Sequence, residues 1–149
     1  MTPEPEPALS QARDGRPAPP GAAARFVQAV NHSDLDRLCD CFSPDALVND
    51  QLRDFWGVQA IRTWARDEVI GEGLALRVVN VREHHGEVIV SAEADGDFDR
   101  DGLPDPLVLT LHFTLRGAWI VRLIILVVLP QDAAPQVRRP PEVFLSEAR

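Results

Sequence analysis

The spacing of apolar side chains changes once along this chain, near residue 74, from a helical period to the alternation of a strand. Apolar residues before this point recur every three or four positions, which is typical of amphipathic helices. After it, apolar and polar residues alternate, which is typical of half-buried strands. The expected helices span 22–30, 34–42 and 58–70, and the expected strands span 46–49, 74–83, 87–98, 107–116 and 118–128. This order predicts an α+β fold with three N-terminal helices packed on a curved antiparallel sheet.

The stretch from Phe26 to Asp50 organises the N-terminal half of the predicted domain. Ser33 is a favourable N-cap for the second helix, and Pro44 is expected to end that helix because proline cannot continue it. A short strand then delivers Asp50 at its end, and residues 51–57 are expected to form a loop.

Proline marks the limits of the predicted domain. Residues 1–20 contain six of the chain's thirteen prolines and almost no large apolar side chains, so we expect a disordered tail. Residues 21–129 form the predicted folded domain, and residues 130–149 form a second proline-rich extension.

Charge and cysteine content restrict the partners and the compartment. The net charge of −8 argues against nucleic acid, whose phosphates it would repel. Neither a signal peptide nor an apolar run of membrane-spanning length is visible, so no membrane partner is expected. Cys39 and Cys41 lie two residues apart on a predicted helix, where they point apart and should not pair, which suits a cytoplasmic protein.

Three motifs, FVQAVNHSDLDRLCDCFSPDALVND, WGVQAIRTW and RGAWIV, occur in an order and at intervals that resemble the nuclear transport factor 2-like superfamily. The resemblance is strongest to its SnoaL-like and ketosteroid isomerase-like branch. It implies a cone-shaped α+β barrel, usually dimeric, with a deep apolar pocket. Members of that superfamily include isomerases, polyketide cyclases, dehydratases and epoxide hydrolases, and also non-catalytic binding domains, so the fold alone does not choose the chemistry.

The resemblance implies one catalytic residue, and other catalytic residues of the related enzymes are replaced in this sequence. Asp50 matches the general base of ketosteroid isomerases, whereas Phe26 and Leu111 stand where those enzymes carry the tyrosine and aspartic acid of an oxyanion hole. Losing one such donor typically costs a factor of about 10²–10³ in rate. Ile124 stands where limonene epoxide hydrolases carry a second aspartate. Neither of these familiar activities is therefore expected.

Asp50 is the predicted catalytic residue, as a general acid or base at the pocket floor, and a solvated turn aspartate is the alternative. Asp54 is a second candidate. Arg122 either faces the pocket, where it would bind a carboxylate or enolate, or faces outward at a dimer interface. His112 is expected on the outer face. The residues expected to bind substrate are Phe26, Phe42, Trp56, Trp64, Leu111, Phe113 and Arg122.

Metal sites are not expected. The segment DFDRDGLPD over 97–105 matches the first half of a calcium loop, but Val108 replaces the required glutamate, and a polar hairpin loop is the better interpretation. His84 and His85 lie at a predicted turn without a third ligand. We therefore expect neither a metal nor another cofactor.

Two functional hypotheses follow. The first is a SnoaL-like enzyme of the isomerase, cyclase or lyase type, which transfers a proton on an apolar or polycyclic carbonyl compound through Asp50. The second is a non-catalytic dimeric binding domain that uses the same pocket. The last expected strand is apolar on both faces apart from Arg122, which predicts a homodimer through the outer face of the sheet.

Overall fold

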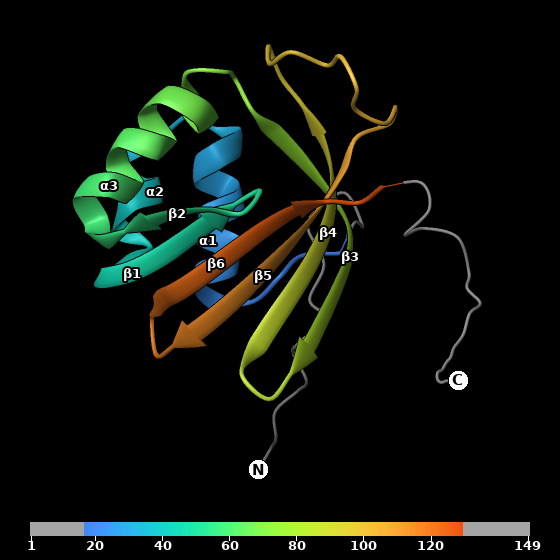
Figure 1. The fold of residues 1–149 in the computed structure, drawn as a ribbon. Helices are drawn as coiled ribbons and strands as arrows, with labels where there is room; N and C mark the ends of the chain where they lie inside the picture. Colours follow the sequence, from blue (N-terminus) through green and yellow to red (C-terminus); the bar gives the residue numbers. More distant parts are fainter. Residues whose placement is uncertain (1–16, 130–149) are drawn as a thin grey trace, which may run out of the picture.

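Helices lie on one face of a six-stranded sheet in the computed structural model, which describes residues 17–129 (Figure 1). Residues 1–16 of the predicted tail over 1–20 and the whole predicted extension over 130–149 lie outside the described residues. The helical elements are α1 (Gly21–Asn31), α2 (Leu35–Asp40), α3 (Gly57–Trp64) and the π-helical turn η1 (Ala65–Ile70). The strands are β1 (Phe42–Asp50), β2 (Arg53–Trp56), β3 (Ala75–His84), β4 (Glu87–Asp95), β5 (Val108–Arg116) and β6 (Trp119–Val127).

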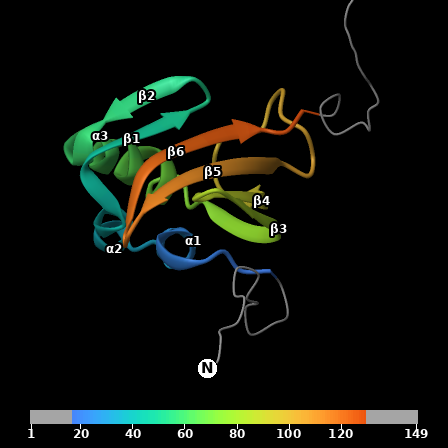
Figure 2. The same ribbon diagram turned by 90° about the horizontal axis from the view of Figure 1, so that it is seen from below.

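The sheet is antiparallel except at one pair of strands. Its order is β2-β1-β6-β5-β4-β3, and β1 runs parallel to β6. Helix α1 contacts β3, β5 and β6, and α3 contacts β1 and β2, so that one face of the curved sheet is covered (Figure 2). The α+β class and the arrangement of three helices on a curved sheet are confirmed.

The core lies between the helices and the covered face of the sheet. Phe26 of α1 packs edge-on against Phe42 and Phe113, with ring centroids 5.9 and 5.6 Å away, and all three are at most 2% exposed. Such pairs stabilise a core beyond the area they bury. Cys39 and Cys41 are buried and unpaired, as expected, and burial raises the pKa of both thiols.

The predicted boundaries of the second helix are wrong at both ends. Asp34, not Ser33, caps α2, because its carboxylate accepts from the backbone N–H of Arg37 at 3.1 Å. Helix α2 ends at Asp40, and Pro44 lies inside β1 rather than at a helix end. The register of β1 with β6 shifts between Phe42 and Leu47, so the missing N–H of Pro44 interrupts no regular ladder.

The predicted loop over 51–57 is also wrong in part. Residues 53–56 form β2, which pairs with β1 through a two-residue turn at Gln51 and Leu52. The third helix begins and ends as expected, but its last six residues are π-helical. None of the helices within 17–129 is long and apolar enough to cross a membrane.

Candidate functional site

The hairpin between β1 and β2 carries Asp50 to the edge of the core. Alternation along β1 turns Val48 and Asp50 toward the helices, while Leu47 and Asn49 face the other side of the sheet. The turn residues Gln51 and Leu52 have φ of 52° and 71°, a left-handed conformation that favours glycine or asparagine. Residues held in such conformations often mark functional sites.

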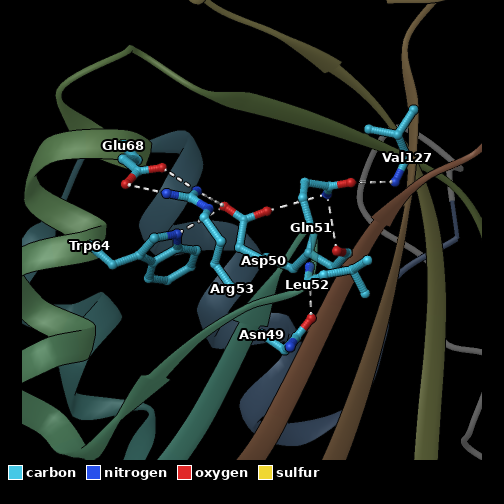
Figure 3. Close-up of polar contacts among 9 residues, drawn as sticks. Asn49, Asp50, Gln51, Leu52, Arg53, Trp64, Glu68 and Val127 are labelled. Carbon is cyan, nitrogen blue, oxygen red and sulfur yellow. Dashed lines mark hydrogen bonds and ion pairs between the residues drawn. The ribbon is translucent and has the colours of Figure 1, made fainter.

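Gln51 holds this turn in place through its side chain. Its Nε2 donates to the Ile125 carbonyl at 3.0 Å, and its Oε1 accepts from the Val127 backbone N–H at 3.2 Å (Figure 3). Its backbone N–H donates to the same Ile125 carbonyl at 3.1 Å. These bonds fasten the hairpin to β6 and fix the direction in which Asp50 points.

Asp50 accepts hydrogen bonds on both carboxylate oxygens. The indole Nε1 of Trp64 donates to Oδ2 at 2.9 Å, and Nε2 of Gln51 donates to Oδ1 at 3.2 Å (Figure 3). The carboxylate side chain is 19% exposed. Both carboxylate oxygens therefore have a side-chain donor, which fixes the orientation of the carboxylate.

Arg53 links Asp50 to the helix layer. Its guanidinium donates to both carboxylate oxygens of Glu68, at 2.6 and 3.1 Å, and Nη2 lies 3.5 Å from Oδ2 of Asp50 (Figure 3). The hydrogen bonds to Glu68 are the largest cause of the raised pKa of Arg53, and Asp50 adds to it. The three side chains form a charged bridge between the hairpin and the π-helical turn.

A cavity of about 220 Å³ lies beside Asp50, between the sheet and the helices. Its walls are mainly aliphatic and aromatic, as in most small-molecule sites. The segment between β4 and β5 contributes Phe98 and Leu103 to one side. The lining residues are Phe26, Asp50, Gln51, Trp64, Glu68, Val69, Leu74, Leu76, Ala94, Phe98, Asp99, Leu103, Leu107, Leu109, Leu111, Ile125 and Val127.

A larger depression of about 620 Å³ lies by the end of α1, the edge strand β3 and its neighbour β4. Its lining includes Arg77, Glu93 and Arg100, which are held in ion pairs at the surface. A specific small-molecule site is normally a mostly apolar cavity with a few converging polar groups. The smaller cavity beside Asp50 fits that description better, and we take it as the candidate site.

Three of the residues expected to bind substrate line this cavity: Phe26, Trp64 and Leu111. Phe42 and Phe113 are fully buried beside Phe26 but are not part of the lining, so they support the cavity wall from behind. The structure therefore brings Asp50 together with aromatic and aliphatic walls from α1, α3 and β5.

Two other residues of that set lie away from the cavity. Trp56 is 66% exposed on β2, opposite Leu47. Arg122 lies on the outer face, where Nη2 is 3.4 Å from Oγ1 of Thr114 and 3.8 Å from Oε2 of Glu87. Strand alternation explains Arg122, because its neighbour Leu123 is the residue that turns inward.

The alternation of side chains along the strands also sets the positions of Asp54 and His112. Asp54 is exposed and accepts from Nδ2 of Asn49 at 2.6 Å, away from the cavity. His112 faces outward, opposite Ile124, as expected. In the acidic segment, Asp99 accepts from the backbone N–H of Asp101 at 2.9 Å, a contact within a polar loop. Residues 17–129 contain no group of three or more metal-ligating side chains suited to a metal ion.

Sequence reasoning missed most of the cavity lining, including Gln51, Glu68, Phe98 and Leu103. Gln51 gives no signal because glutamine and leucine are not typical of a two-residue turn. Phe98 and Leu103 lie in or next to the segment interpreted as a polar loop, and only the fold shows that they close over the cavity.

Comparison with known proteins gives a consistent pattern. The sequence pattern of the SnoaL-like domain family matches residues 23–123. No protein of curated function matches the chain significantly.

Solved structures supply further matches. A "putative polyketide cyclase" from Sinorhizobium meliloti is 27% identical, with a TM-score of 0.65, over 72% of this chain and 94% of the other. An NTF2-like protein from Cytophaga hutchinsonii is 10% identical, with a TM-score of 0.59, over 71% and 86%. A protein with a ketosteroid isomerase-like fold from Catenulispora acidiphila, in complex with trimethylamine, is 20% identical, with a TM-score of 0.60, over 78% and 98%.

Proposed function

Because the chain belongs to the SnoaL-like domain family, we propose that its cavity binds a small apolar compound on which Asp50 transfers a proton. The observation that carries this proposal is the carboxylate of Asp50, which lines an apolar cavity and is oriented by the indole N–H of Trp64 at 2.9 Å. The cavity of about 220 Å³ is smaller than the roughly 300–1,000 Å³ typical of drug-sized ligands. Its size favours a substrate of one or two rings over a polycyclic one.

The reaction would be of the isomerase, cyclase or lyase type, without a metal. Asp50 would act as general base on a carbon next to a carbonyl group, with Trp64 and Gln51 holding its two oxygens in place. The neighbour from Sinorhizobium meliloti supports a reaction of the cyclase type only as an analogy of fold and partial sequence.

A second candidate function is binding without catalysis. The specific observation in its favour is that the lining offers no donor for a developing oxyanion at the two relevant positions, Phe26 and Leu111. The amide N–H groups of Gln51 donate to Asp50 and to the Ile125 carbonyl. An enolate formed in this cavity would lack the stabilisation that such donors normally provide.

One experiment separates the two candidates. Small apolar carbonyl compounds are screened by thermal shift against the wild type and against Ala94→Leu, which fills part of the cavity. Compounds that stabilise the wild type but not the filled variant are then assayed for turnover. We expect Asp50→Asn to lower turnover by a factor of about 10²–10⁴. Asp54→Asn, the same change at an exposed aspartate, should have no effect.

Binding without turnover in the wild type would contradict the enzyme hypothesis and support the binding domain. Turnover that persists in Asp50→Asn would contradict the role of Asp50. The absence of any compound that distinguishes the wild type from Ala94→Leu would contradict the cavity as the ligand site.

The proposal includes a homodimer through the outer face of the sheet. Ile89, His112 and Ile124 form a row across β4, β5 and β6 on that face, and Leu126 is 37% exposed beside them. No helix of residues 17–129 covers this face, so a second copy would shield its apolar side chains from water.

A further inference from the structure

The ionisable residues that line the cavity are all acidic. They are Asp50, Glu68 and Asp99, and the described lining includes no lysine, arginine or histidine. We propose that the ligand of this cavity is a small apolar molecule with a positive charge, such as an amine or an iminium ion. The charge preference rests on the proposed function only in taking the same cavity as the ligand site, whereas proton transfer from such a ligand also requires Asp50 as the base.

The charges around the cavity leave a negative excess. Arg53 contacts both Asp50 and Glu68, and its single positive charge offsets one of the three carboxylates. The whole chain carries a net charge of −8, which adds a field of the same sign. An anionic ligand would meet repulsion here, whereas a cation would be attracted.

The walls of the cavity suit an organic cation rather than a metal ion. Phe26 and Trp64 contribute aromatic rings to the lining, and Phe98 adds a third ring, over which the guanidinium carbon of Arg100 lies 4.9 Å from the centroid. The faces of aromatic rings attract ammonium groups, most strongly where water is excluded. Aliphatic side chains from β5 and β6, including Leu111 and Ile125, complete an enclosure for an apolar body. The aromatic walls and the carboxylates therefore favour the same class of ligand.

A cationic substrate would also remove the need for an oxyanion donor. When Asp50 takes a proton from the carbon next to a C=N⁺ group, the C–H electron pair forms a C=C bond. The π pair of C=N⁺ becomes a lone pair on nitrogen, so the products are a neutral enamine and a protonated Asp50. No negative charge develops on the ligand, and Phe26 and Leu111 no longer stand at positions where a donor is required.

The test uses three probes of the same shape and different charge: phenyltrimethylammonium, tert-butylbenzene and benzenesulfonate. Dissociation constants are measured by NMR titration against the full chain at low salt. We expect the cation to bind about tenfold more tightly than the neutral probe, and the anion to bind most weakly. Asp50→Asn and Asp99→Asn should each weaken binding of the cation several-fold and leave the neutral probe unaffected.

The control is Asp54→Asn, which removes the same charge outside the cavity and should change neither constant. The melting temperature of each variant shows whether it is folded. If Asp50→Asn does not fold, Asp99→Asn tests the charge preference instead, because Asp99 lies on an exposed loop. Equal or tighter binding of the neutral probe or the anion would overturn the charge preference. Failure of all three probes to bind would overturn it as well, and the screen with Ala94→Leu would still decide the proposed function.

Discussion

Arg53 is the cation that shields the candidate site. It donates to both oxygens of Glu68 and lies 3.5 Å from Asp50, so it neutralises part of the negative charge beside the cavity. Its side chain is 53% exposed, and an exposed ion pair of this kind contributes about 0–1 kcal/mol to stability. Arg53 therefore affects the electrostatic potential at the site more than it affects the stability of the fold.

Replacing this arginine should strengthen the binding of a cation. We expect Arg53→Gln to lower the dissociation constant of phenyltrimethylammonium by about two- to fivefold, because it removes the only positive charge that contacts Asp50 within residues 17–129. The measurement is an NMR titration at low salt. Arg77→Gln is the matched control, because it removes an arginine from an ion pair of similar exposure. The side chains of Arg77 and Glu93 are 50% and 36% exposed, and those of Arg53 and Glu68 are 53% and 36% exposed. Weaker binding by Arg53→Gln would contradict this account.

The difference between Asp50 and Asp54 lies beyond what the sequence predicts. The two aspartates lie four residues apart, Asp50 at the end of the short segment ALVN and Asp54 in the expected loop over 51–57. The β1–β2 hairpin determines the positions of the two side chains, because it directs Asp50 toward the cavity and pairs Asp54 with Asn49 on the outside. That hairpin has a Gln-Leu turn, so the turn chemistry that normally identifies a hairpin is missing.

At the scale of secondary structure, the segment between β4 and β5 closes the cavity because its start is tied to the turn that follows η1. The backbone N–H of Asp97 donates to the Glu72 carbonyl at 2.7 Å, and Gly96 allows this approach. A Cβ at Gly96 would lie 2.9 Å from the Glu72 carbonyl oxygen and 2.9 Å from the Phe98 ring. Neither contact is tolerated without a shift of the segment.

We expect Gly96→Ala to lower the free energy of unfolding by about 1–3 kcal/mol and to weaken ligand binding, because it displaces Phe98 from the cavity wall. Urea denaturation and the same NMR titration provide the two readouts. Gly102→Ala in the same segment meets no atom within 4 Å at its Cβ. It has φ of 79°, so it should cost about 1 kcal/mol through backbone strain and leave affinity unchanged. Unchanged affinity in Gly96→Ala would contradict the role of this segment.

At the scale of the whole molecule, the two faces of the sheet have different environments. The inner face packs on the helices, and the outer face carries Ile89, Ile124 and Leu126 without cover from any helix of residues 17–129. The sequence of β6 predicts that the outer face needs cover, because a strand that is apolar on both faces requires cover on both.

We expect the wild type to be a dimer at micromolar concentrations and Ile124→Glu to be a monomer, because the substitution buries an unpaired charge in the proposed interface. Size-exclusion chromatography with light scattering measures both masses. Leu52→Glu makes the same kind of change at the hairpin tip, where Leu52 is 83% exposed, and should remain dimeric. A monomeric wild type, or a dimer that survives Ile124→Glu, would contradict the proposed interface.

The fold class was predictable because its signal is spread over many residues: the helical period, then the alternation of four long strands. The cavity was only partly predictable because its walls come from distant segments. The sequence indicated Phe26, Trp64 and Leu111, which line the cavity, but it left the face of Arg122 open and did not show that Trp56 is exposed, since one residue of strand phase decides which face a side chain takes.

The central claim is that the cavity beside Asp50 is the ligand site, and methyl NMR tests it most directly. Ile125 lines the cavity and is 6% exposed, whereas its neighbour Ile124 faces outward on the same strand. On addition of a ligand from the screen, the account predicts shifts of the methyl signals of Ile125 and Leu111 and none at Ile124. Shifts at Ile124 with unchanged signals at Ile125 and Leu111 would contradict it.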